Sequence, residues 1–273
     1  MSAESPRQTL ERSPRASPQV LLNHDLLIAA GVLGVLVLLL GQLGLFDPAR
    51  LSKGASNLVL FARETFPPDT EILPQALAAL WETIHMALAG SLLGFIFAVP
   101  LGFLGARNLM PRVVVYATRV FVGAIRTVPS LLWAVIFVIT VGLGPLAGTL
   151  ALAVYTAGYL AKLYAETFEA VDPEILEAVS ALGARPWHLA RFVMWHESAN
   201  SVWSQLLFMI EYNIRASAIL GFVGAGGIGL LLNLYINTLT YQRVAMVLIL
   251  ILIVVLAMDV LSRMVRKRFL LTK

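Results

Sequence analysis

The chain has 273 residues, of which 59% are hydrophobic and only 13% are charged. A soluble domain is about half apolar and about a quarter charged, so this composition excludes an ordinary soluble enzyme and predicts that many apolar side chains face lipid. The net charge of +4 is typical of the basic cytoplasmic loops of membrane proteins and does not indicate nucleic-acid binding. Cysteine is absent, which excludes disulfides, thiol catalysis and cysteine-ligated metals.

The N-terminal part of the sequence changes character at residue 26. Residues 1–25 are rich in Ser, Pro and Arg and are predicted to form a disordered cytoplasmic tail. The apolar run 26–46 follows, and it is interpreted as a retained helix because a signal peptide would begin much nearer the start of the chain. Residues 51–66 are weakly amphipathic, which favours a helix lying along the outer membrane interface.

Further apolar runs are each long enough to cross a hydrocarbon core of about 30 Å. The charge-free stretch 127–161 is too long for one crossing, and the cluster Gly142–Pro145 supplies the break. The sequence therefore predicts an all-α, polytopic membrane protein whose permease domain covers residues 26–264. The six predicted spans are 26–46, 83–106, 113–141, 146–168, 202–223 and 244–261.

The distribution of basic residues predicts the orientation of these spans. Lys and Arg concentrate in the segments that a six-span arrangement places on the same side as both termini. Because such residues favour the cytoplasmic side, both termini are expected to be cytoplasmic. The basic C-terminal segment 265–273 is then interpreted as an anchor at anionic lipid headgroups.

The cytoplasmic segment 172–191 is predicted to be a folded elbow. Asp172 and Pro173 have the residue types of a helix N-cap and first turn, Gly183 ends that helix, and Pro186 begins a second segment through Arg191. Residues 175, 176, 179 and 182 form an apolar stripe at helical spacing. The spacing alone favours equally a surface for a partner and a helix resting on its own bundle.

The elbow resembles the cytoplasmic loop signature of ABC-importer permeases, E-A-A-x3-G-x9-I-x-L-P. Here Glu177, Ala178 and Gly183 keep the spacing. Val179 and Val193 replace the second Ala and the Ile, and Trp195 and His196 replace the usual Leu and Pro. The resemblance implies a coupling helix seated in a cleft of an ATPase subunit. The residues expected at that contact are Glu177, Ala178, Leu182, Gly183 and Arg185.

A second resemblance covers most of the chain from about residue 66 and is to the membrane subunit of phosphonate ABC importers. The stretches that carry it are FPPD at 66–69, TIHMALAGSLLGFIFAVPLGFLGARN from Thr83, RTVPSLLWAVIFV from Arg126, GLGPLAGTLALAVYTAGYLAKLYAE from Gly142 and EYNIRASAILGFVGAGGIG from Glu211. The resemblance implies a type I ABC-importer permease fold in a prokaryotic inner membrane. It also implies a homodimer, two cytoplasmic ATPase subunits that carry ATP and Mg, and an external phosphonate-binding protein.

Glu211 and Arg215 are four residues apart on the fifth predicted span, in the order that favours an ion pair within a helix. Neither charge is expected to face lipid. One interpretation is a self-satisfied pair that fixes helix packing. The other is that Arg215 lines the pathway and attracts a passing oxyanion.

Gly224, Gly226 and Gly229 match G-x-G-x-x-G, but no strand precedes them and no acidic residue follows at the distance that a dinucleotide site needs. The cluster, with Gly227, instead predicts a backbone bend that serves either as a gate or as a plain loop. Pairs of small residues four apart, at 90 and 94 and at 144 and 148, are suited to close helix packing in lipid.

The sequence lacks the phosphate loop G-x-x-x-x-G-K-[ST], so ATP hydrolysis by that mechanism is not expected in this chain. The histidines show no metal-ligand spacing, and no metal or catalytic site is predicted. The predicted function is an ATP-driven permease that moves a phosphonate or related phosphorus oxyanion by alternating access. The alternatives are a gradient-driven transporter or channel for a small anion, and, less favoured, an intramembrane enzyme.

Overall fold

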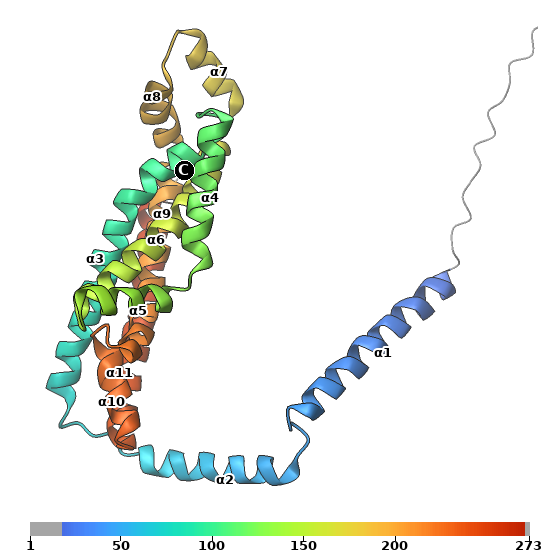
Figure 1. Cartoon of the computed structure of the whole chain (residues 1–273), viewed down its shortest axis with the longest axis vertical. Helices are drawn as coiled ribbons and strands as arrows, with labels where there is room; N and C mark the ends of the chain where they lie inside the picture. The colour runs from blue at the N-terminus through green and yellow to red at the C-terminus, as the bar shows by residue number, and fades with distance from the viewer. Residues whose placement is uncertain (1–17, 271–273) are drawn as a thin grey trace, which may run out of the picture. The chain divides into compact units, whose positions relative to one another are not determined.

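The computed structural model describes residues 18–270, and these residues form helices and connecting turns without a strand. The chain divides into two compact units, residues 1–63 and 64–273. The first contains α1 (Pro18–Gln42) and most of α2 (Pro48–Thr65). The second contains all later helices and the predicted coupling and pathway residues (Figure 1).

In the first unit, α1 begins at Pro18, inside the segment that was expected to be disordered, while residues 1–17 lie outside the described residues. The helix ends at Gln42, before the predicted end at residue 46, and Gly44 has a positive φ of 82° in the turn that follows. The carboxylate of Asp47 accepts the N–H of Ala49 at 3.0 Å, which caps the start of α2. The bounds of α2 agree with the amphipathic stretch predicted at 51–66.

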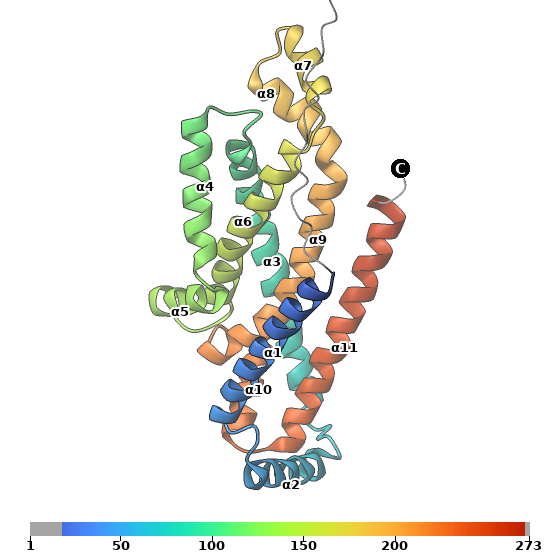
Figure 2. The same ribbon diagram turned by 90° about the vertical axis from the view of Figure 1, so that its right-hand side faces the viewer.

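The second unit is a bundle of long helices with shorter helices at its ends and across it (Figure 2). Its helices are α3 (Leu73–Gly105), α4 (Arg112–Thr127), α5 (Ser130–Val141), α6 (Pro145–Glu169), α7 (Pro173–Ala181), α8 (Pro186–His188), α9 (Trp195–Leu220), α10 (Ile228–Asn237) and α11 (Tyr241–Val265). A π-helical turn, Leu189–Met194, joins α8 to α9. The α7 and α8 helices lie together at one end of the bundle, beyond the C-terminal end of α11.

The centre of the bundle is the contact between α3 and α6, the most extensive between any two helices. A Cβ built on Gly90 would lie 2.7 Å from Cβ of Leu152, and one built on Gly94 would lie 2.6 Å from Cβ of Thr156. The two backbones approach this closely because glycine has no side chain, as the 90/94 pair predicted. Gly144 was predicted wrongly, since it has open space around it and a φ of 127° at the start of α6.

The segment 113–141 was expected to be one span, but it forms two helices, α4 and α5, that are bent by 84°. Pro129 explains the break. Proline has no N–H to continue the helix, and it excludes the helical conformation at the residue before it. Val128 accordingly has φ −88° and ψ 119°, which is extended backbone.

Within residues 18–270, four helices are long and apolar enough to cross a membrane, and the bent α4–α5 pair makes up to five. These four are Leu73–Gly105, Pro145–Glu169, Pro186–Val223 and Tyr241–Arg268. The first predicted span contributes the shorter apolar helix Leu26–Gln42. The number of six spans therefore stays a prediction. The helix α10, between the fifth and sixth predicted spans, was not foreseen.

An ion pair joins the segment before α3 to the first turn of α11. Nε of Arg243 donates to Oδ2 of Asp69 at 2.9 Å, and the N–H of Asp69 donates to the carbonyl oxygen of Gln242. The Arg243 guanidinium, helped by the N–H of Glu71, holds the pKa of the Asp69 carboxyl below its ordinary value. The pair thus stabilises the end of the bundle where α3 and α11 begin.

This pair predicts a pH dependence of stability. A carboxyl whose pKa is lower in the folded state contributes stability above its unfolded pKa, and this contribution is lost as the pH falls through the folded pKa. We expect the thermal unfolding temperature of the wild type to exceed that of Asp69→Asn at neutral pH. The difference should shrink on acidification to about pH 3. A difference that stays constant over this range would contradict the role given to Asp69.

Candidate functional site

The elbow begins directly after α6. Oδ1 of Asp172 accepts the N–H of Glu174 at 2.9 Å, which is the predicted N-cap of α7. Gly183 follows the helix with φ 80°, a conformation that an L side chain adopts only with strain. The N-cap and the glycine turn that the sequence predicts are therefore both present.

The inner face of the elbow is held against the bundle. Leu176 and Val193 belong to the same buried cluster as Phe168 of α6, and Val179 packs against it. The predicted stripe is only half buried, however, because Ile175 and Leu182 are exposed, Leu182 by 86%. An elbow anchored by one face and open on the other can present its outer surface to a partner.

All five residues predicted at the coupling contact lie on that open surface, and they are Glu177, Ala178, Leu182, Gly183 and Arg185. Two aromatic side chains from α8 and the π-helical turn, Trp187 and Phe192, are exposed by 66% and 65%. They line a surface pocket of about 370 Å³ together with Arg191 and Phe103. Exposed large apolar side chains beside charged ones are typical of protein interfaces.

The second segment of the elbow does not end at Arg191 as expected. Helical structure continues from Pro186 through the turn at 189–194 into α9 without an interruption. The sequence departure noted above explains this, since His196 stands where the family motif has a proline, and proline would break the helix. The elbow is therefore continuous with α9.

The Glu211–Arg215 pair is formed, with Nη2 of Arg215 at 2.9 Å from Oε1 of Glu211. A third charged residue, which sequence reasoning missed, completes the group: Nη2 of Arg266 lies 3.8 Å from Oε2 of Glu211. Arg266 is the residue directly after α11. Because its side chain reaches Glu211, Glu211 lies beside the C-terminal end of α11 and not beside its middle. The Glu211 side chain is almost fully buried, whereas that of Arg215 is 47% exposed.

Arg215 opens into a pocket of about 270 Å³ between α9 and the start of α5. The other lining residues are Ser130, Leu131, Tyr212, Ala216, Ile219 and Leu220. A guanidinium that is half exposed beside a hydroxyl and apolar walls can attract an oxyanion without enclosing it. Because Glu211 has two arginine neighbours, Arg266 still compensates its negative charge when Arg215 binds an anion.

The glycine segment after α9 makes the bend that the sequence predicts. Gly224, Gly226 and Gly227 all have positive φ, between 70° and 84°. The N–H of Gly144, in the turn between α5 and α6, donates to the carbonyl oxygen of Gly224 at 2.9 Å. The segment thus packs directly on the turn between α5 and α6.

Two side chains of α3 cap the start of α10 across the bundle. Oε1 of Glu82 accepts the N–H of Gly227, and Oγ1 of Thr83 accepts the N–H of Ile228, each at 2.7 Å. Glu82 was interpreted as the boundary of a span, but α3 begins nine residues before it. Glu82 is half-buried, and the hydrogen bond from the N–H of Gly227 satisfies one oxygen of its carboxylate.

A buried polar group joins α3, α6 and α9. Nδ2 of Asn213 donates to Oγ of Ser91 at 2.8 Å and to Oγ1 of Thr156 at 2.7 Å. Hydrogen bonds between helices in a membrane contribute about 1 kcal/mol each. The sequence signal that could have identified this polar group is a single Asn, Asn213, in an apolar stretch. Among the described residues, no group of three His, Asp or Glu side chains could hold a metal ion.

The long apolar helices, the bent pair and the projecting elbow are those of a polytopic helical membrane protein. Residues 90–271 match the family described as the binding-protein-dependent transport system inner membrane component, and the chain belongs to that family. The phosphite transport system permease protein PtxC of Stutzerimonas stutzeri is 36% identical over 239 residues, covering 87% of each chain. The phosphate-import permease protein PhnE of Mycolicibacterium smegmatis is 37% identical over 204 residues, 74% of this chain and 38% of that protein.

The fold has solved counterparts. A chain of the inward-facing MetNI methionine ABC transporter superposes with a TM-score of 0.64 at 22% identity, covering 73% of this chain and 98% of that one. At this identity the likeness shows the fold alone. Together with the family match, it assigns the chain to the inner membrane and to the type I importer permease architecture.

Proposed function

We propose that this chain is the permease subunit of an ATP-driven ABC importer that carries a phosphonate or a related phosphorus oxyanion such as phosphite or phosphate. Its relatives are named for phosphite and phosphate import. The observation that carries the ATP-driven assignment is the α7–α8 elbow at one end of the bundle, with Leu182, Trp187 and Phe192 exposed on it. This surface is the proposed seat of the ATPase subunit.

The proposed assembly contains two permease chains, two cytoplasmic ATPase subunits that bind ATP and Mg, and an external binding protein. Both termini of this chain are placed in the cytoplasm, on the side of the elbow, because basic residues concentrate there. Closure of the ATPases would bring the two elbows together. The continuity of α8 with α9 would carry this motion to the glycine segment 224–227, the proposed gate.

The first test is co-purification. The full-length permease, expressed from its own host and extracted in detergent, should carry one ATPase chain per permease chain. The substrate can then be identified with the external binding protein of the same importer. Of phosphonate, phosphite and phosphate, the true substrate should raise the thermal unfolding temperature of that protein. A permease that purifies alone under all mild conditions would contradict the proposed assembly.

The pathway assignment predicts the effect of removing the Arg215 charge. We expect Arg215→Ala to lower oxyanion uptake by at least about tenfold, since the charge-assisted contact with the anion is lost. The folded chain should survive because Glu211 keeps Arg266 as a partner at 3.8 Å. Uptake by proteoliposomes and the oligomeric state in detergent are the two measurements.

The matched control is Glu211→Gln, which breaks the same ion pair but leaves the Arg215 charge in the pocket. If Arg215 serves the anion, this variant should retain most of the uptake. If the two residues only fix the packing of α9, both variants should lose uptake equally. This result would contradict the proposal that Arg215 lines the pathway.

A further inference from the structure

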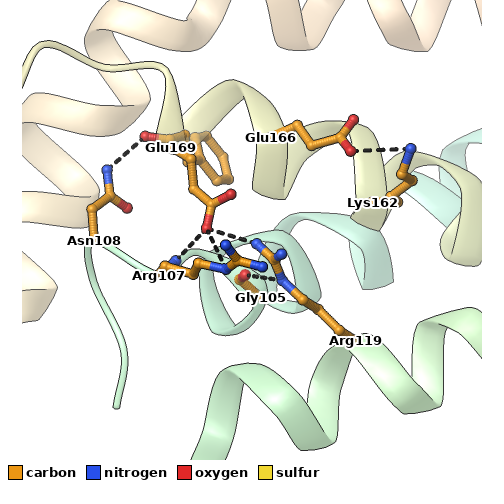
Figure 3. Close-up of polar contacts among 8 residues, drawn as sticks. Gly105, Arg107, Asn108, Arg119, Lys162, Glu166 and Glu169 are labelled. Carbon is orange, nitrogen blue, oxygen red and sulfur yellow. Dashed lines mark hydrogen bonds and ion pairs between the residues drawn. The ribbon is translucent and has the colours of Figure 1, made fainter. Parts of the chain in front are cut away.

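A cluster of polar contacts lies where the end of α6 meets the turn between α3 and α4 (Figure 3). Glu169, the last residue of α6, is at its centre, and its side chain is 25% exposed. One carboxylate oxygen, Oε1, accepts the N–H of Arg107 at 2.7 Å and Nη2 of Arg119 at 2.6 Å. A single side chain therefore holds both the α3–α4 turn and α4.

The partners of Glu169 are themselves fixed. Nε of Arg119 donates to the carbonyl oxygen of Gly105, in the last turn of α3, at 3.0 Å. Nδ2 of Asn108 donates to the carbonyl oxygen of Phe168 at 2.9 Å. The ring of Phe168 also stacks on that of Phe103, with centroids 4.1 Å apart. We call these contacts around Glu169, Arg107, Arg119 and Asn108 the clasp.

The clasp lies between the elbow, which is proposed to move, and the bent pair of helices α4 and α5. On one side, only residues 170–172 separate Glu169 from α7, and Val171 is buried, so the elbow is attached through a short, packed connection. On the other side, Arg119 belongs to α4, which leads through the bend at Pro129 to α5. Displacement of the elbow would reach α4 through the clasp.

We propose that Glu169 is a positioning residue that transmits motion of the elbow to α4 and α5. The inference rests on the proposed function, because it takes the elbow as the ATPase contact. The side chains of Arg119 and Glu169 are only 34% and 25% exposed, and the pair shares two further hydrogen bonds, so it differs from the freely solvated surface pairs that contribute little. It also joins separate helices, as a transmitting contact must.

The experiment compares Glu169→Gln with wild type in the whole importer, reconstituted with its ATPase and binding protein. The amide keeps an acceptor for the Arg107 N–H but loses the charge that holds Arg119. We expect ATPase subunits to bind at wild-type stoichiometry and hydrolysis to continue, while substrate taken up per ATP falls by about tenfold. An unchanged ratio of uptake to hydrolysis would overturn the proposal.

The chain offers a matched control one turn earlier on α6. Lys162 and Glu166 form an exposed ion pair at 3.0 Å within the same helix, so it joins no other element. Glu166→Gln should leave uptake per ATP within about twofold of wild type, as expected for a surface pair. A loss equal to that of Glu169→Gln would show a general effect of charge on α6 and would overturn the proposal.

A double variant tests whether Glu169 acts through Arg119. Arg119→Gln alone should uncouple the importer to a similar extent, and Glu169→Gln with Arg119→Gln should be no worse than the more affected single variant. Fully additive losses would show that the two residues act independently, against the proposal. A wild-type importer that transports without ATP would instead contradict the proposed function, and this is visible before any variant is made.

A second measurement leaves the clasp intact, so it can contradict the proposal even if Glu169→Gln does not accumulate. Because the chain has no cysteine, spin labels can be placed at Ala170→Cys and Ala117→Cys, which are both exposed. If the clasp moves as one body, their separation should stay within about 2 Å between the nucleotide-free and ATP-bound importer. A larger change would overturn the proposal.

Discussion

Gly183→Asp should release the ATPase subunits from the permease. We expect ATPase affinity to fall by about 100-fold, or ~3 kcal/mol, because the new carboxylate would be buried at the interface without a partner. A Cβ at Gly183 has nothing within 4 Å in the isolated chain, so the permease itself should fold. Co-purification and titration of ATPase onto purified permease measure the effect.

Gly142 supplies the matched control. It also has a positive φ, 93°, and open space around its Cβ position. Gly142 lies before the start of α6, and the elbow lies after the end of α6. The 25 residues of this helix span about 37 Å, so the two sites are far apart. Gly142→Asp therefore adds the same charge at a second positive-φ position, far from the elbow, and should leave ATPase binding unchanged. Equal losses in both variants, or full binding by Gly183→Asp, would refute the docking assignment.

Gly94→Leu should prevent assembly of the bundle. A Cβ at this position would lie 2.6 Å from Cβ of Thr156 and 2.8 Å from the carbonyl oxygen of Ala153. Because one of these atoms belongs to the backbone, α3 and α6 would have to separate, at a cost of ~3 kcal/mol or more. Thr156 would also move away from Asn213, its hydrogen-bond partner. We expect the variant to accumulate poorly and to unfold at a much lower temperature in detergent.

The comparison variant is Gly123→Ala in α4. A Cβ there has nothing within 4 Å, so no helix needs to move, and alanine has a helix propensity about 1 kcal/mol better than glycine. This variant should be as stable as wild type or slightly more so. A Gly94→Leu chain that unfolds at the wild-type temperature would show that α3 and α6 are not packed backbone to backbone.

Local patterns in the sequence were sufficient for the elbow and for much of the bundle. The N-cap at Asp172 and the turn at Gly183 depend on residue types at fixed short spacings, and both are present. The fourth span, predicted at 146–168, corresponds closely to α6. The bend at Pro129 was also readable, because the residue before a proline is rarely helical, but the long apolar run around it favoured one continuous span.

The contacts that join distant segments could not be predicted in the same way. Glu169 meets Arg107 across 62 positions, and Glu82 meets the N–H of Gly227 across 145. A charged residue inside or beside an apolar run indicates that some partner exists, but the pattern does not identify it, since the partner depends on how the helices pack. This is why Glu82 was assigned to a boundary and Arg266 was not associated with Glu211.

The central claim is that ATP hydrolysis by a partner moves a phosphorus oxyanion through this permease. Its most direct test is uptake of labelled phosphite or phosphonate by proteoliposomes that contain the permease, its ATPase and its binding protein. Uptake should require ATP, should stop when a non-hydrolysable analogue replaces it, and should persist when ionophores collapse all ion gradients. Uptake without ATP that disappears with the gradients would identify a secondary transporter and contradict the account.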